Sequence, residues 1–174
     1  CFAKALEIDP NFLDARINIG RTLVEQNRPD EAVEQLKIAV QTAPHDAVAH
    51  HHLGNAYSLQ EEWELAIGSQ LAALEIRPEF PEAESRLAKL YAESGDNDSA
   101  RTVITNLRNR GIVTLDMLYV IGNLPGNPIK VDVDEELEKL ARQNENFSSE
   151  HQVDIDFIRA GALHRSGDYD AAAT

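Results

Sequence analysis

The sequence predicts an all-α fold, a right-handed α–α superhelix built from stacked antiparallel helix pairs. The first observation behind this prediction is a period of 34 residues between successive prolines (44 − 10 and 78 − 44). The second is that two columns of small residues share this period. The three columns are Pro10, Pro44 and Pro78; Ala32, Ala66 and Ala100; and Gly20, Gly54 and Ala88. A period shared by independent columns is typical of helical solenoids, in which each unit packs on its neighbours.

Large apolar residues between these columns recur three and four positions apart. In the first unit they are Ile19, Leu23, Val33 and Leu36. This spacing is typical of amphipathic helices rather than of strands. Small residues allow two helix backbones to cross closely, and each proline can end a helix because it lacks an N–H and restricts the residue before it. Each unit is therefore predicted to be a helix, a short turn and a second helix.

This pattern resembles the tetratricopeptide repeat, a helix–turn–helix of the same length with small residues at two fixed positions and a proline near its end. The resemblance implies three consecutive repeats at 13–46, 47–80 and 81–114. It also implies that residues 1–12 are the second helix of an earlier, truncated repeat. The third repeat departs from the pattern, since Ile112 stands where the first two repeats have proline.

Beyond residue 114 the period weakens. Residues 115–147 are predicted to form a divergent repeat, with an inserted loop at 123–128 that contains two prolines and a second helix at 133–143. Residues 148–174 are predicted to be a partial C-terminal repeat, because the run 166–172 again resembles the turn between two helices. Both ends of the chain are therefore expected to be cut within repeats.

The segment order after residue 114 is similar to the linker of bacterial tetratricopeptide-repeat sulfotransferases. The resemblance rests on Phe157, on Gly161-Ala162-Leu163 and on the run from Ser166 to Ala172. In that family, a C-terminal domain binds the phosphosulfate donor through a phosphate loop. No segment of this chain has a glycine-rich motif ending in Gly-Lys-Ser/Thr. The resemblance thus implies a catalytic domain beyond Thr174 and assigns no catalytic residue and no cofactor to this chain.

Charge and composition exclude several classes of partner. The formal net charge is −14, which repels nucleic acids and anionic membrane surfaces. A single cysteine, Cys1, rules out an internal disulfide and a cysteine-based zinc site, and suits a reducing compartment. No apolar run approaches the length of about 20 residues that a membrane span needs, and no signal peptide is visible. We therefore expect a cytoplasmic protein that binds neither nucleic acid nor membrane.

Three consecutive histidines, His50, His51 and His52, stand out as candidate ligands. Adjacent residues on a helix point about 100° apart, so these three side chains do not converge on one metal ion. We predict no metal site. In the register of the repeats, His51 and His52 are instead expected to face the inner groove that the first helices line.

That groove is the predicted binding site for a protein or peptide partner. Its expected residues are Asn18, Arg21, His51, His52, Asn55, Arg86 and Lys89. Cationic and amide donors at helical spacing can hold a carboxylate or phosphate, and arginine does so with two parallel hydrogen bonds. The alternative is that these residues are solvated, with Arg86 and Lys89 paired to nearby acids such as Glu82 and Glu93.

Three functional hypotheses follow from the sequence. The first is a protein-interaction module without catalysis, which holds an extended peptide, with or without an anionic group, in its concave groove. The second is that the repeats are the substrate-recruiting arm of a sulfotransferase. The third is a structural scaffold that self-associates through its cut terminal helices.

Overall fold

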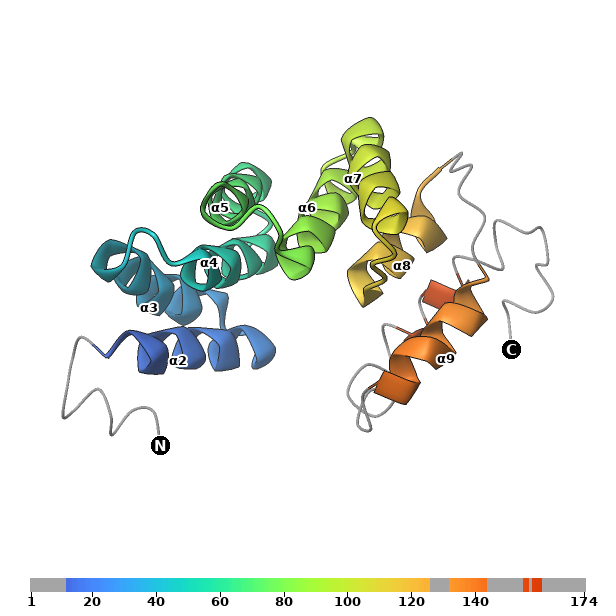
Figure 1. Ribbon diagram of the computed structural model, residues 1–174. Coiled ribbons are helices and arrows are strands. Elements are labelled where there is room, and N and C mark those ends of the chain that lie inside the picture. Colours follow the sequence, from blue (N-terminus) through green and yellow to red (C-terminus); the bar gives the residue numbers. More distant parts are fainter. Residues whose placement is uncertain (1–11, 126–131, 144–154, 157, 161–174) are drawn as a thin grey trace.

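The computed structural model describes residues 12–125, 132–143, 155, 156 and 158–160, and the described part is helical with no strand. The helices are, in chain order, α2 (Leu13–Glu25), α3 (Pro29–Thr42), α4 (Ala47–Leu59), α5 (Trp63–Ile76), α6 (Pro81–Glu93), α7 (Asn97–Asn109), α8 (Leu115–Asn123) and α9 (Val133–Gln143) (Figure 1).

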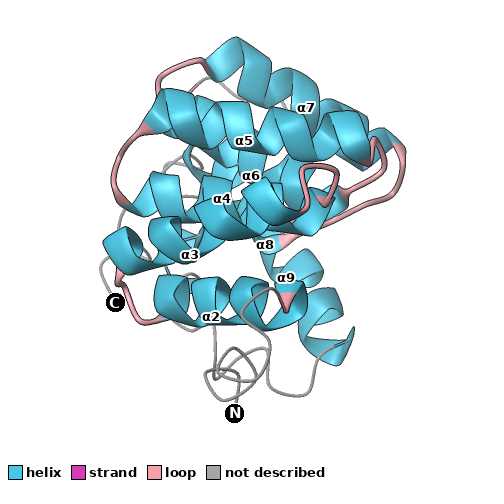
Figure 2. Ribbon diagram, turned by 90° about the vertical axis from the view of Figure 1, so that its left-hand side faces the viewer, coloured by secondary structure: helices cyan, strands magenta, loops and turns pink. Residues whose placement is uncertain are grey.

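Successive helices pack as antiparallel pairs, α2 with α3, α4 with α5 and α6 with α7, and the pairs stack on one another. The predicted fold class is therefore confirmed. Figures 1 and 2 both place α5 and α7 on the side of the stack opposite to α2 and α9. The helices α2, α4, α6 and α8 form the other layer, in which each contacts the next along the chain.

Helix starts follow from local chemistry. The carboxylate of Asp46 accepts a hydrogen bond of 2.8 Å from the backbone N–H of Ala49, and this satisfies one of the unpaired donors at the first turn of α4. Proline begins α3 at Pro29 and α6 at Pro81, where its missing N–H costs nothing. The turn after α6 has Gly95 at a φ of 91°, a conformation that favours glycine.

The small-residue columns lie where helices cross. A Cβ added to Gly20 would stand 2.4 Å from the Leu36 side chain. A Cβ added to Gly54 would stand 2.7 Å from Gln70 and 3.0 Å from the backbone oxygen of Ala66. The alanine columns at these crossings are fully buried. The sequence-based expectation of close crossings at these columns is therefore confirmed.

The C-terminal part departs from the regular pairing. The predicted helix at 133–143 exists as α9, and its Val133 and Leu137 pack on Leu118. However, Gly122 of α8 faces the backbone of Ile158, whose oxygen would lie 3.1 Å from an added Cβ. That contact matches the one between Gly54 and the second helix of its pair, a role that the sequence analysis gave to 133–143. Of the loop predicted at 123–128, Asn123 instead ends α8 and Leu124 is buried in the core. Residues 1–11 of the predicted first helix, residues 126–128 of the loop and most of 148–174 lie outside the described residues.

Candidate partner-binding groove

The layer formed by α2, α4, α6 and α8 opens between α4 and α6. These two helices share few contacts, whereas α2 packs closely on α4 and α6 on α8. A pocket of about 390 Å³ lies at this opening. Its lining residues come from α4, from α6 and from the start of α8: His51, Glu82, Ser85, Arg86, Thr114, Leu115 and Asp116.

Two predicted groove residues, Arg86 and Lys89, lie together on α6 and share one acid on α8. The Nε atom of Arg86 is 3.2 Å from Oδ2 of Asp116, and Nζ of Lys89 is 3.6 Å from Oδ1. The Lys89 ammonium also lies 4.4 Å from the centroid of the Tyr119 ring. All three charged side chains are partly buried, with exposed fractions of 19% to 28%. Two cations therefore share a single carboxylate in a partly desolvated place.

The acid that pairs with these cations is Asp116, whereas the sequence analysis offered Glu82 and Glu93 as their partners. Glu93 lies one turn beyond Lys89, and burial raises the pKa of its carboxyl while Lys89 and Arg86 oppose that rise. Taken by themselves, Arg86, Lys89 and Asp116 carry one more positive than negative charge, while Glu82 lines the same pocket and Glu93 interacts with both cations.

The predicted residues His51 and Asn55 are tied to a buried glutamine of α5. Gln70 Nε2 donates to the backbone oxygen of His51 at 3.2 Å and to Oδ1 of Asn55 at 3.1 Å. Because the backbone oxygen only accepts, the amide of Gln70 is oriented with its oxygen toward the imidazole, 2.9 Å from Nδ1. His51 Nδ1 therefore donates, and Nε2 accepts from Asn55 Nδ2 at 3.2 Å. Every polar atom of this network has a partner only when the imidazole is neutral.

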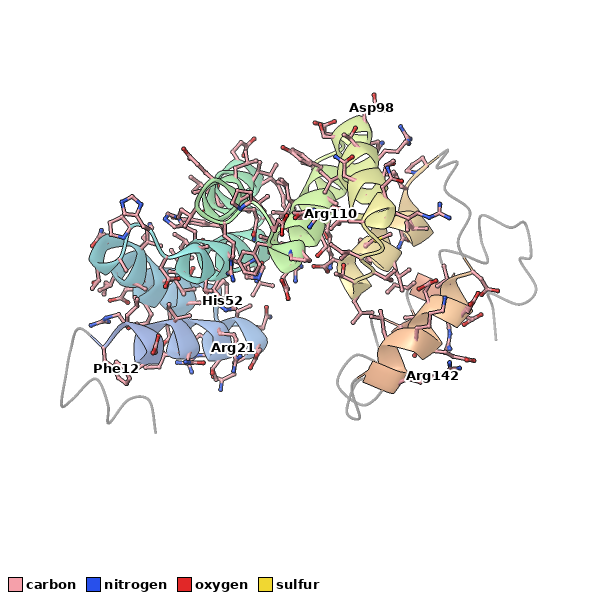
Figure 3. The ribbon with its side chains drawn as sticks, viewed as in Figure 1. Phe12, Arg21, His52, Asp98, Arg110 and Arg142 are labelled. Atoms are coloured by element: carbon pink, nitrogen blue, oxygen red, sulfur yellow. The ribbon has the colours of Figure 1, made fainter. Side chains whose placement is uncertain are left out.

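Burial acts on both histidines in the same direction. It lowers the pKa of His51, with the hydrogen bond to Gln70 opposing the shift. It also lowers the pKa of His52 to about 4, and the neighbouring His51 and Arg21 add to this shift. Figure 3 shows His52 between α4 and α2, near the end of α2 that carries Arg21. Both imidazoles are accordingly neutral at pH 7 and add no positive charge to the groove.

The two remaining predicted residues lie on α2 and have local partners. Asn18 Nδ2 donates to the backbone oxygen of Asp14 at 2.7 Å. Arg21 lies 3.5 Å from Glu25, and both side chains are more than half exposed. Such an exposed pair is worth little and leaves the guanidinium available to a ligand. The structure thus divides the predicted residues into three sets. Asn18 and Arg21 lie on α2, His51, His52 and Asn55 lie on α4, and Arg86 and Lys89 form the cationic cluster on α6.

The sequence analysis missed three residues of this site: Gln70, Asp116 and Tyr119. For Gln70 a signal was present, because the equivalent positions of the neighbouring repeats are Leu36 and Ile104 (70 − 36 and 104 − 70 are both 34). A polar residue in an otherwise apolar column indicates a buried polar network. For Asp116 and Tyr119 the repeat register gave no comparable signal.

Among the described residues, no group of three histidine, cysteine or acidic side chains comes together as metal ligands. Within the same ranges, no helix is both long enough and apolar enough to cross a membrane.

Stacked antiparallel helix pairs with small residues at their crossings define the class of helical-repeat proteins. Two family models, both described as tetratricopeptide repeat, match residues 2–53 and 49–84. These matches show tetratricopeptide repeats over residues 2–84, and the resemblance predicted from the sequence is confirmed over that part of the chain.

Among curated proteins, the chain is similar to Tetratricopeptide repeat protein 17. Identity is 34% over 89 residues to the proteins of Rattus norvegicus and Homo sapiens. The match covers 50% of this chain but only 7% and 8% of those two proteins. The chain thus spans less than a tenth of the length of these relatives.

Solved structures with similar folds include three of low sequence identity. PilW, described as a type IV pilus biogenesis factor, gives a TM-score of 0.65 at 24% identity and covers 87% of this chain and 71% of its own. The pilF protein of Pseudomonas aeruginosa gives a TM-score of 0.62 at 19% identity, and the match covers 99% of this chain and 77% of that protein. YrrB, described as a TPR protein with an unusual peptide-binding site, gives a TM-score of 0.62 at 16% identity, and the match covers 99% of this chain and 87% of that protein. These likenesses establish the fold alone.

Proposed function

We propose that the concave layer of this chain binds a segment of a protein partner and that Arg86 and Lys89 hold an acidic group of that segment. Tetratricopeptide repeats are in general protein-interaction modules, which supports the class of function. The observation that carries the finer proposal is that two cations share the single carboxylate of Asp116 beside a pocket of about 390 Å³. YrrB, which has the same fold, is described as having a peptide-binding site.

The chemistry of the cluster favours a carboxylate ligand. A partner carboxylate that approaches Arg86 and Lys89 brings the number of negative charges at the cluster to two, equal to the number of cations. Arginine also offers parallel N–H donors that match the two oxygens of a carboxylate. The proposed entry point for the segment is the pocket of about 390 Å³, which lies where α4 and α6 share few contacts.

Ligand selection comes before the mutational test. An array of peptides with free C-terminal carboxylates and with internal Asp or Glu is screened against the wild-type chain. Isothermal titration calorimetry then gives the dissociation constant of the best binder at several salt concentrations. We expect affinity to fall with salt, because the contact joins opposite charges that are screened by ions.

Two variants are predicted to change the affinity for the peptide in opposite directions, which distinguishes the proposal from a general loss of structure. The double variant Arg86→Ala with Lys89→Ala should weaken binding by about tenfold or more, since a charge-assisted contact is worth about 1.5–3 kcal/mol. Asp116→Asn should tighten binding because it removes the competing carboxylate. Arg142→Ala, on α9, removes one positive charge from an exposed ion pair and should leave affinity unchanged. Unchanged affinity in the double variant contradicts the proposal.

The other predicted functions have less support. The relatives and structures named above are not described as sulfotransferases, so the role of a sulfotransferase arm stays a prediction, as do self-association through terminal helices and a cytoplasmic location. Reading the encoding gene beyond Thr174 tests the enzyme prediction directly, since a glycine-rich phosphate loop would follow.

A further inference from the structure

We infer that the outer face of α5 is a second docking surface, which receives a basic amphipathic helix from a protein partner. This face consists of Glu64, Leu65, Gly68, Leu71 and Glu75, all exposed. Leu65 and Leu71 are 50% and 46% exposed, among the most exposed large apolar side chains of the described residues. None of these five residues lines the pocket between α4 and α6, so this surface is distinct from the proposed groove.

The neighbouring repeats show that the fold does not require an apolar surface at these positions. One period earlier, on α3, the residues equivalent to Leu65, Gly68 and Leu71 are Glu31, Glu34 and Lys37. One period later, on α7, they are Ser99, Thr102 and Thr105. Both α3 and α7 form ordinary helices with these polar residues. The apolar surface is therefore a property of α5 alone among the three, and packing among the described residues does not explain it.

Gly68 gives an independent observation. Gly20, Gly54 and Gly122 each face another element so closely that a Cβ would clash or press on it, but a Cβ added to Gly68 meets nothing within 4 Å. A glycine in the middle of a helix destabilises it relative to alanine. No contact among the described residues compensates for that cost. A partner helix that crosses α5 at Gly68 would compensate for the cost, because the missing side chain allows the two helices to approach closely.

Charge defines the chemistry of the partner. Glu64, Gly68, Leu71 and Glu75 follow one another at spacings of four, three and four residues, so they form one stripe with a carboxylate at each end. Between residues 61 and 79 there are five glutamates and one basic residue, Arg77, whose guanidinium lies 3.6 Å from the Phe80 ring centroid. A second copy of this acidic face would be repelled. A helix with leucines on one face and lysine or arginine beside them fits both the apolar centre and the acidic ends.

The test uses a designed probe and repeat-matched variants. The probe is a labelled, end-blocked helical peptide with leucine on one face and lysine on the other, and its counterpart has glutamate in place of lysine. Binding is measured by fluorescence anisotropy. The graft variant Leu65→Ser, Gly68→Thr and Leu71→Thr carries the α7 residues at these positions, so it keeps both the fold and the net charge.

We expect the wild-type chain to bind the lysine peptide and the graft variant to bind it about a hundredfold more weakly, since two leucines are lost and each contact is worth about one factor of ten. Glu64→Gln with Glu75→Gln should weaken binding and reduce its salt dependence. Leu59→Gln, which changes another exposed leucine outside this face, should have no effect. The double variant of Arg86 and Lys89 should also bind normally, which separates this inference from the proposed function.

Several outcomes overturn the inference. Equal binding by the wild-type chain and the graft variant shows that the peptide recognises the net charge rather than this face. Equal binding of the glutamate peptide removes the case for a basic partner. If the wild-type chain does not bind the lysine peptide at all, the inference is also overturned. A wild-type dimer in sedimentation velocity that the graft variant abolishes assigns the face to a second copy.

Gly68→Ala adds a test of the close crossing. The variant should unfold at a higher urea concentration than the wild type, because alanine stabilises the helix and has room for its methyl group. The same variant should bind the lysine peptide more weakly. Gly20→Ala is the matched control and should unfold at a lower urea concentration, because its Cβ would clash with Leu36. Undiminished binding by Gly68→Ala contradicts the crossing at this residue.

Discussion

His52 should make the stability of the chain depend on pH between about 6.5 and 4. Burial holds its pKa at about 4 in the folded state, with His51 and Arg21 adding to the shift and Asp46 opposing it. In the unfolded chain the imidazole has its ordinary pKa of 6.5. As the pH falls below 6.5, the unfolded state therefore binds a proton that the folded state does not, and stability is lost until about pH 4. Between pH 7 and pH 5 this loss amounts to about 2 kcal/mol.

The assay is urea unfolding at pH 7, 6 and 5, followed by the fluorescence of Trp63, the only tryptophan in the sequence. Trp63 is partly buried against the core cluster that extends from α2 to α6, so its emission reports on the packed state. His52→Gln removes the titrating group and should lose about 2 kcal/mol less than the wild type between pH 7 and pH 5. The variant His45→Gln controls for removing an exposed histidine. If wild type and His52→Gln lose stability in parallel, the reasoning from burial is refuted.

Two further predictions concern single positions. Gln70→Leu restores the apolar column but leaves His51 Nδ1 and Asn55 Oδ1 without partners, so it should destabilise the chain by about 1–3 kcal/mol in urea unfolding at pH 7; a gain in stability would show that the network contributes nothing. Asp46→Ala removes the hydrogen bond to the Ala49 N–H and should cost about 1 kcal/mol of unfolding free energy, whereas Asp46→Asn should keep most of it.

The fold could be predicted because its constraints recur with the chain's own period. The residues at positions 20 and 54 must be small, since the second helix of each pair passes where a Cβ would stand. Pro29 and Pro81 mark helix starts. Such features are local or repeat at a fixed distance, so a single sequence displays them several times. After residue 114 the period fails, and the contact between Gly122 and Ile158 was not foreseen for the same reason.

The candidate site was less accessible to sequence reasoning. The register placed Arg86 and Lys89 on one surface of α6, and the structure brings them together. Their partner Asp116 belongs to the divergent region, where no register fixed its direction. For His52, the register indicated a position in the layer but carried no information about burial, which depends on how closely α2 approaches α4. The charge state of the groove therefore required the packed structure.

Departures from the repeat carry more information about function than the repeat itself. Positions that follow the period are constrained by packing, and every repeat of this class satisfies them whatever it binds. The second repeat departs twice: inward at Gln70, where its neighbours have Leu36 and Ile104, and outward at the apolar face of α5. The inward departure locks His51 and Asn55 beside the pocket between α4 and α6. The outward departure adds exposed leucines that no contact within the described chain requires. The two faces of the second repeat are therefore where partner recognition should be sought by mutation, with the first and third repeats as internal controls.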